Sequence, residues 1–280
     1  MNNVLYINKP KGITSFDICF KLRKVLGTKR IGHTGTLDPN ATGVMIILYD
    51  NATKANQFLV SDTKKYTTRV LFGIETDTLD LDGNIIKKSE YTLPDINTLK
   101  DVLNSFMGES RQEVPMTSAI KINGKKLYQY QLEGKEVEIP VRDINVYQID
   151  LIEMYEDGFS FSCTVSSGTY VRALVRDILK KLDLAGTVME LRRDMIDSIS
   201  IDDCDELEDV LNGNYHTHDL LELLSLRYKK IETDNEADIK NGKKIKLDCD
   251  DEMVIITHDN KLLAVYGKDN DTYRCIRGMW

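Results

Sequence analysis

The sequence has no long apolar run and no closely paired cysteines, and these absences argue against membrane proteins and disulfide-rich proteins. No stretch approaches the roughly 18 apolar residues that a membrane-spanning helix requires, and the opening MNNVLYINKPKG has too short an apolar run to act as a signal peptide. The five cysteines are scattered and form no Cys-x-x-Cys pair, which argues against a disulfide framework and a cysteine-rich zinc site. These features predict a cytoplasmic protein with reduced thiols and no membrane contact.

The chain as a whole also lacks a net positive charge, since its formal net charge is -8, yet its charges are unevenly spread. Residues 1–74 contain 11 Lys and Arg against 4 Asp and Glu, whereas residues 202–225 contain 8 acidic residues and neither Lys nor Arg. A basic N-terminal third attracts phosphates while an acidic segment elsewhere faces water. An uneven surface with no nucleic-acid partner explains the same charges equally well, so charge alone leaves both interpretations open.

What the sequence does contain is a succession of short strands, helices and hairpins. The predicted elements are strands at 4–7, 44–49 and 64–73, helices at 14–27 and 94–108, hairpins that turn at 123–124 and 157–158, and a strand-to-helix passage at 166–182. Because helices and hairpins are interleaved, we predict an α+β fold with a mixed, largely antiparallel sheet flanked by helices.

The pattern changes near residue 226. The acidic residues 202–225 predict a helix and a connection, and beyond them short strand-like runs, of which KNGKKIKL (240–247) is the first, alternate with Asn-Gly and Asp-Asn turns. We therefore predict two domains, one formed by residues 1–225 and a small β domain formed by residues 226–280.

The acidic segment TDTLDLDG (76–83) has the spacing of part of a calcium-binding loop. Its first ligand would be Thr78, and its twelfth position holds Ser89 where such loops carry Glu. We therefore interpret this segment as a solvated turn.

The loop GHTGTLDPNATGV (32–44) places a single carboxylate, that of Asp38, among glycines and threonines. Pro39 has a fixed backbone angle and restricts Asp38 to extended geometry, so the acid is held rigidly at the mouth of a strand. A lone carboxylate suits covalent nucleophilic catalysis, whereas hydrolysis by paired acids needs a second one nearby. Taken by itself, an Asp in such a loop is more often an Asx turn or a helix cap.

Six separated motifs stand out along the chain, namely KPKGITS (9–15), GHTGTLDPNATGV (32–44), KKYTTRVLFGIETDTLDLDG (64–83), GKKLYQY (124–130), SSGTYVRALVRD (166–177) and LRRD (191–194). In this order they resemble the motifs of the bacterial tRNA pseudouridine-55 synthase family. The resemblance covers about residues 3–200 and implies the pseudouridine synthase fold. The remaining C-terminal segment is similar in character to the small PUA-like RNA-binding domain that ends many such enzymes.

The resemblance implies an isomerase that acts on the T arm of tRNA without cofactor or metal. In this reaction the uridine at position 55 is detached at N1, turned, and rejoined to its ribose through C5. Asp38 falls on the nucleophile of the family, Tyr66 on the tyrosine that stacks against the target base and assists proton removal, and Arg172 on the arginine that pairs with the nucleophile. We expect a monomer that requires no protein partner.

The resemblance also implies substrate-binding residues. His33, Tyr170 and Leu191 fall on positions that contact the RNA or line the base pocket, and Lys9 belongs to a motif that supports the catalytic loop. His33, Tyr170 and Leu191, like Tyr66 and Arg172, each have an ordinary structural interpretation as a core, capping or surface residue, and only the joint pattern favours function.

Two residues depart from the family pattern. Gln131 stands where many relatives carry a basic residue, and Asp194 stands where a small or neutral residue is usual, so both reduce the positive charge along the expected RNA path.

Two other functions compete with the isomerase. One is a tRNA-binding or tRNA-folding factor whose chemistry is dispensable, and the intact Asp38, Tyr66 and Arg172 favour the enzyme over it. The other is an unrelated hydrolase with a covalent intermediate on Asp38, which the lack of a second nearby acid disfavours.

Overall fold

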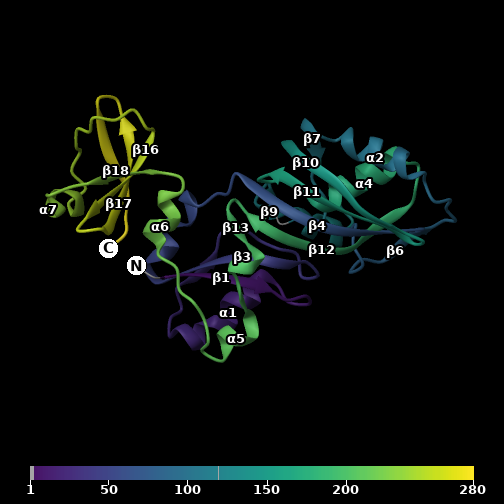
Figure 1. Ribbon diagram of the computed structural model, residues 1–280, viewed down its shortest axis with the longest axis horizontal. Coiled ribbons are helices and arrows are strands. Elements are labelled where there is room, and N and C mark those ends of the chain that lie inside the picture. The colour runs from purple at the N-terminus through teal and green to yellow at the C-terminus, as the bar shows by residue number, and fades with distance from the viewer. Residues whose placement is uncertain (1–2, 119) are drawn as a thin grey trace. The chain divides into compact units, whose positions relative to one another are not determined.

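The computed structural model describes residues 3–118 and 120–280, which form two compact units (Figure 1). The first unit contains the chain up to Pro39 together with residues 44–60 and 202–280, and the second contains residues 40–43 and 61–201. Within the described ranges, no helix is long and apolar enough to cross a membrane.

The first unit begins with a small sheet in which β1 lies between β14 and β3, while β2 pairs with β3. Its elements are β1 (Val4–Lys9), α1 (Ser15–Leu26), β2 (Ile31–His33), β3 (Thr42–Tyr49), the 3-10 helices η1 (Asp50–Phe58) and η2 (Ile201–Asp203), β14 (Asp205–Glu206), α5 (Leu207–Leu211) and α6 (Leu220–Ser225). The chain enters α1 through a capping box, in which the Thr14 side chain accepts from the Asp17 backbone and the Asp17 side chain accepts from the Thr14 backbone.

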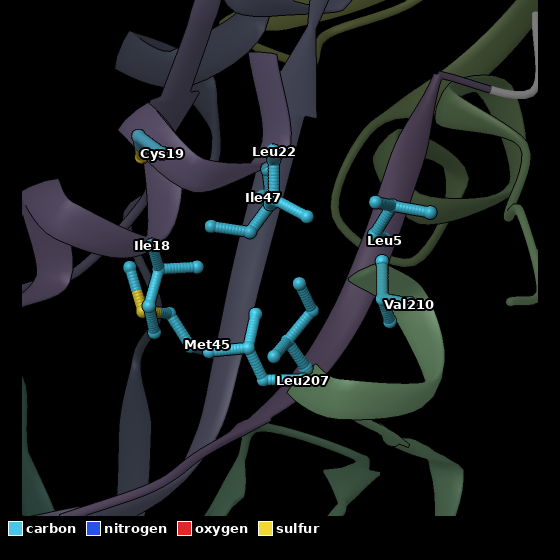
Figure 2. Close-up of a cluster of buried hydrophobic side chains, with 9 residues drawn as sticks. Leu5, Ile18, Cys19, Leu22, Met45, Ile47, Leu207 and Val210 are labelled. Carbon is cyan, nitrogen blue, oxygen red and sulfur yellow. The ribbon is translucent and has the colours of Figure 1, made fainter. Parts of the chain in front are cut away.

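A core of aliphatic side chains joins this sheet to its helices (Figure 2). Ile18, Cys19 and Leu22 come from one face of α1 and meet Leu5, Met45 and Ile47 of the strands, with Leu207 and Val210 of α5 beside them. All are nearly or fully buried, and each large side chain of this kind contributes about 1.5–3 kcal/mol by leaving water. The predicted strand at 44–49 is therefore a buried core strand, as its unbroken apolar run indicated.

The C-terminal part of the first unit carries a separate four-stranded sheet in the order β15-β16-β17-β18. Its elements are β15 (Lys229–Glu232), α7 (Glu236–Lys240), β16 (Met253–His258), β17 (Lys261–Asp269) and β18 (Thr272–Gly278). It has its own core, in which Ile239 of α7 packs with Val254, Tyr266 and Tyr273. A small C-terminal β domain is thus confirmed, whereas its boundary at residue 226 stays a prediction.

The predicted strand KNGKKIKL (240–247) is wrong. Lys240 ends α7, and the residues after it form a turn and an extended stretch in which Ile245 makes an isolated bridge with Tyr273. Asn235 caps α7 because its side chain accepts from the backbone N–H of Asp238. Lys240, which the sequence pattern placed at the start of a strand, is therefore the last residue of a helix.

The second unit is built on an antiparallel sheet in the order β12-β4-β11-β10-β7. Its elements are β4 (Thr63–Phe72), β5 (Ile74–Thr76), β6 (Ile85–Lys88), α2 (Ile96–Asn104), β7 (Gly108–Glu113), β8 (Lys121–Ile122), β9 (Lys125–Lys126), α3 (Leu127–Leu132), β10 (Val141–Tyr155), β11 (Gly158–Ser166), α4 (Val171–Lys181), β12 (Gly186–Ile196) and β13 (Ile199–Ser200). Together with the parallel pairing of β1 with β14, this confirms the predicted α+β class with a mixed, largely antiparallel sheet.

One glycine of the loop 32–44 is required by close backbone packing in the second unit. Thr42 and Gly43 pair in parallel with Arg192 and Arg193 of β12. Gly43 has a φ of +108°, and a Cβ at this position would lie 2.2 Å from the carbonyl oxygen of Arg193. A side chain at residue 43 would therefore push apart the backbone that follows the Asp38 loop.

Candidate active site

The loop that carries Asp38 is held by the N-terminal motif of the first unit. Lys9 is fully buried at the end of β1, and its Nζ donates to the carbonyl oxygens of Pro10 at 3.0 Å and Pro39 at 2.9 Å. The backbone N–H of Gly12 donates to the same Pro39 carbonyl at 2.9 Å. A buried ammonium group is tolerated where such acceptors replace water, so Lys9 ties the residue after Asp38 to the fold.

The residue before Asp38 is fixed by the start of α1. Ser15 Oγ accepts from the backbone N–H of Leu37 at 2.9 Å and donates to the Leu37 carbonyl at 3.0 Å, and both residues are buried. Asp38 itself is partly exposed between these two anchored neighbours. The loop therefore presents its carboxylate on a backbone that is hydrogen-bonded on either side.

His33 ends β2 in the same unit. It lies opposite Ile47 of β3 in the strand register, and the next residue, Thr34, donates its backbone N–H to the carbonyl of Ile46 at 3.2 Å. His33 is partly exposed where the loop leaves the sheet, and its Nδ1 is buried.

Tyr66 and Leu191 occupy neighbouring strands of the second unit. Tyr66 lies on β4 opposite Arg193 of β12, and Thr68 lies opposite Leu191, so these side chains share one face of the sheet. Tyr66 and Arg193 are 7% and 1% exposed, whereas Leu191 is partly exposed. The strand register thus places an aromatic ring, a buried cation and an aliphatic side chain together.

Arg172 is buried in the first turn of α4, where the segment 76–83 surrounds it. Its Nη1 donates to the carbonyl of Thr78 at 2.7 Å and to Thr117 Oγ1 at 2.8 Å, and it lies 3.3 Å from Asp80 Oδ2. Asp80 is only 8% exposed and also accepts from Thr78 Oγ1 at 2.6 Å. The interpretation of 76–83 as a solvated turn is therefore wrong, because Asp80 is drawn inward to a buried guanidinium.

Tyr170 stands at the N-cap of the same helix. Its backbone N–H donates to Gln112 Oε1 at 2.9 Å, and its carbonyl accepts from Gln112 Nε2 at 3.2 Å. The buried Gln112 of β7 thereby fixes the backbone of Tyr170, while the tyrosine side chain stays partly exposed.

The two residues that depart from the family pattern serve local structure. Gln131 donates to the carbonyl of Asp77 at 3.2 Å and links α3 to the segment 76–83. Asp194 accepts from Thr67 Oγ1 at 2.7 Å and from Arg192 Nε at 2.6 Å, so it neutralises a neighbouring arginine on the sheet.

Sequence reasoning missed Asp80, Thr117 and Gln112 as supports of Arg172 and Tyr170. Asp80 lies inside the family-like motif at 64–83, and this position is the sequence feature that could have marked it as functional. Among residues 3–118 and 120–280, no group of three or more His, Cys, Asp or Glu side chains is arranged to hold a metal ion.

Comparison with known proteins identifies a family. A sequence model described as TruB family pseudouridylate synthase (N terminal domain) matches residues 23–171. A protein from Lactobacillus acidophilus named tRNA pseudouridine synthase B is 34% identical, and the alignment covers 98% of this chain and 97% of that relative. A protein of the same name from Alkaliphilus oremlandii is 43% identical over 75% of this chain and 70% of its own length.

Solved structures share the fold at low sequence identity. A structure described as an H/ACA RNP bound to a substrate RNA containing 2'-deoxyuridine matches with a TM-score of 0.74 at 18% identity, over 99% of this chain and 85% of that one. A Cbf5-Nop10-Gar1 complex matches with a TM-score of 0.73 at 19% identity, over the same shares of the two chains. At these identities the match establishes the pseudouridine synthase fold.

Proposed function

The chain belongs to the TruB family of pseudouridylate synthases, and on this premise we propose that it converts uridine to pseudouridine at position 55 in the T loop of tRNA. The observation that carries the proposal is the match, over nearly the full length of both chains, to a relative named tRNA pseudouridine synthase B. The enzyme is an isomerase, since the product contains the same atoms as the substrate.

The direct test is to incubate the protein with unmodified T-arm RNA and to map pseudouridine by carbodiimide treatment followed by primer extension. One strong stop at the T-loop uridine is expected. An RNA that stays unmodified, or a stop at a different uridine only, contradicts the proposal.

Asp38 is the proposed nucleophile of this reaction. Its carboxylate forms a transient bond to the nucleotide, the bond between N1 and the ribose C1′ breaks, and a bond between C5 and C1′ forms. The bond to Asp38 breaks before the product leaves, so the carboxylate is regenerated. The C5 proton then leaves and N1 gains a proton, so the isomerisation balances without any cofactor. Tyr66 stacks on the base and assists removal of the C5 proton. Arg172 pairs with the Asp38 carboxylate, as the resemblance to the family implies.

The substrate uridine has to leave the folded T loop before any of these residues reaches it. Extruding a base costs a few kcal/mol of unstacking. Stacking on an aromatic side chain returns about 1–3 kcal/mol per base, which is the contribution we assign to Tyr66 and to His33. Tyr170 and Leu191 line the base pocket, and Lys9 holds the loop that carries the nucleophile.

The proposal extends to the protein's partners and place in the cell. The enzyme binds the T arm of tRNA, acts as a monomer without a protein partner, and works in the cytoplasm where its substrate is processed. Residues 226–280 form an accessory RNA-binding domain, and residues 1–225 form the catalytic domain.

A further inference from the structure

Two cations of the second unit converge on the turn between β11 and α4. Lys64 of β4 brings its Nζ to 3.3 Å from Ser167 Oγ. Arg142 of β10 lies over the neighbouring Gly168, since a Cβ built on that glycine would be 3.2 Å from Arg142 Nη1. Lys64, Arg142, Ser167 and Gly168 are called the Lys64 cluster below.

The surroundings of Lys64 favour an incoming anion. Its side chain is largely removed from water, and the guanidinium of Arg193 repels it while the Asp197 carboxylate attracts it. Asp197 Oδ1 accepts from the backbone N–H groups of Asp62 and Thr63, both at 2.9 Å. The negative charge of Asp197 is therefore partly satisfied by these two amides as well as by Lys64. Burial together with Arg193 lowers the pKa of Lys64 to about 8.

The backbone of the turn lies close to one of these cations. Gly168 has a φ of +90° and carries no side chain to separate Arg142 from the turn. Ser167, Gly168 and Lys64 are all partly exposed, and Arg142 is exposed. The backbone amide of the N-cap residue Tyr170 already donates to Gln112, so we assign this site to the side chains.

The Lys64 cluster borders the residue proposed to contact the base. Lys64 and Tyr66 are two residues apart on β4 and therefore face the same side of the sheet. Arg193, which acts on Lys64, lies opposite Tyr66 in the register with β12. An anion bound at the cluster therefore lies within about one nucleotide of a base stacked on Tyr66.

We propose that the Lys64 cluster binds one phosphodiester of the RNA strand next to the nucleotide that is isomerised. The cluster recognises a phosphate anion, and its assignment to RNA rests on the proposed function. Lys64 supplies a point charge, Arg142 a second charge, and Ser167 a hydroxyl donor to the phosphate oxygens.

The test measures binding of a T-arm RNA hairpin to the full chain. Lys64→Met removes the charge at nearly constant length, and Arg142→Gln removes the second charge at an exposed position. Lys65→Met is the matched control, because Lys65 carries the same charge on the opposite, exposed face of the same strand. We expect Lys64→Met to weaken binding about tenfold and to flatten the slope of log K against log salt by about 0.7. Lys65→Met has less than a twofold effect.

A second arm places a neutral methylphosphonate at one RNA phosphate at a time. A single position next to the target uridine weakens binding to the wild-type protein and leaves binding to Lys64→Met unchanged. Lys64→Arg, which keeps the charge, retains wild-type affinity. If Lys64→Met does not give the circular dichroism of the wild type, Arg142→Gln decides in its place with the same expected pattern.

A third arm follows pH from 6.5 to 8.5. The ammonium form of Lys64 binds phosphate, so affinity is constant below about pH 7 and falls as pH rises through the pKa near 8. The charged groups that act on Lys64 from the elements packed against it are Arg193, which repels its ammonium, and Asp197, which attracts it. Lys64→Met and Lys64→Arg therefore lose the pH dependence.

Two results overturn the phosphate site. One is wild-type affinity and salt slope in Lys64→Met, and the other is an equal loss in Lys64→Met and Lys65→Met. If the wild type makes no pseudouridine while Lys64→Met still weakens binding tenfold, the proposed function fails and the Lys64 cluster stands as a phosphate site only. If the wild type makes pseudouridine and Lys64→Met binds normally, the proposed function stands and the phosphate site fails.

Discussion

Nη1 of Arg172 lies 3.3 Å from Oδ2 of Asp80, and both side chains are almost completely buried. A buried ion pair is costly to break from one side, because the remaining charge keeps its desolvation penalty without its partner. Arg172 also donates to Thr78 and Thr117, so Asp80 is one of several groups that fix the guanidinium in the first turn of α4.

Replacing Asp80 by Asn keeps the shape of this contact and removes its charge. We expect Asp80→Asn to lower the free energy of unfolding by about 2 kcal/mol, as for a hydrogen bond to a charged group, and to slow single-turnover isomerisation because Arg172 is less firmly oriented. Urea unfolding and single-turnover kinetics on T-arm RNA measure the two effects. Asp82→Asn, which changes an exposed carboxylate in the same segment, is the matched control. Equal behaviour of the two variants would show that Asp80 does not position Arg172.

The reason why sequence reasoning missed Asp80 is physical. Acidic residues in a turn are usually solvated, and nothing within 76–83 indicates that an arginine from a distant helix will be buried against them. Local patterns did predict the alternating strand at 64–73, the Asn123-Gly124 turn and the apolar run of β3, since each depends on neighbouring residues. The registers that bring Tyr66 opposite Arg193 and Gly43 against Arg193 depend on pairing between remote segments, and a single sequence carries little information about such pairing.

Lys9→Met tests the support of the Asp38 loop. The substitution keeps an unbranched chain and leaves the carbonyls of Pro10 and Pro39 without the Lys9 donor. We expect a loss of about 2 kcal/mol in the free energy of unfolding and a lower rate of isomerisation at saturating RNA. Lys11→Met, two residues along at an exposed position, serves as the control. A thermal melt compares the stability of the two variants, and a Lys9→Met protein as stable and active as Lys11→Met would exclude this supporting role.

Asp38→Asn separates binding from chemistry. The amide has the shape of the carboxylate but cannot act as the nucleophile, so turnover is expected to disappear while T-arm RNA is bound within about threefold of wild type. The assay is single-turnover conversion at saturating enzyme, paired with a filter-binding titration. Isomerisation within tenfold of the wild-type rate would rule out the covalent role, and would favour a protein whose main task is to bind and fold tRNA.

Tyr66→Phe separates stacking from proton transfer. The ring, which is 7% exposed, stays in place on β4, whereas the hydroxyl is lost. We expect near-normal RNA affinity and a single-turnover rate reduced by at least 100-fold, which is the range for loss of a general acid or base, about 10²–10⁴. Cys163, which lies opposite Tyr66 on β11, can be changed to Ser as a control for disturbance of the sheet. Unchanged kinetics in Tyr66→Phe would reduce Tyr66 to a packing residue.

RNA binding should weaken steeply with salt despite the formal charge of -8. Lys21 and Lys24 on α1 and Lys29 after it are exposed, so phosphate contacts made by this basic third of the chain release counterions regardless of the acidic residues elsewhere. If about four to six phosphates are neutralised, log K falls against log salt with a slope of roughly -3 to -4, at about 0.7 per contact for single strands.

Replacing one of these lysines by Gln should flatten the slope by somewhat less than one unit and leave the modified uridine unchanged, because phosphate contacts position the RNA and the pocket selects the base. Titrations at four salt concentrations measure the slope. Affinities that stay constant from low to physiological salt would show that residues 1–74 do not face the RNA.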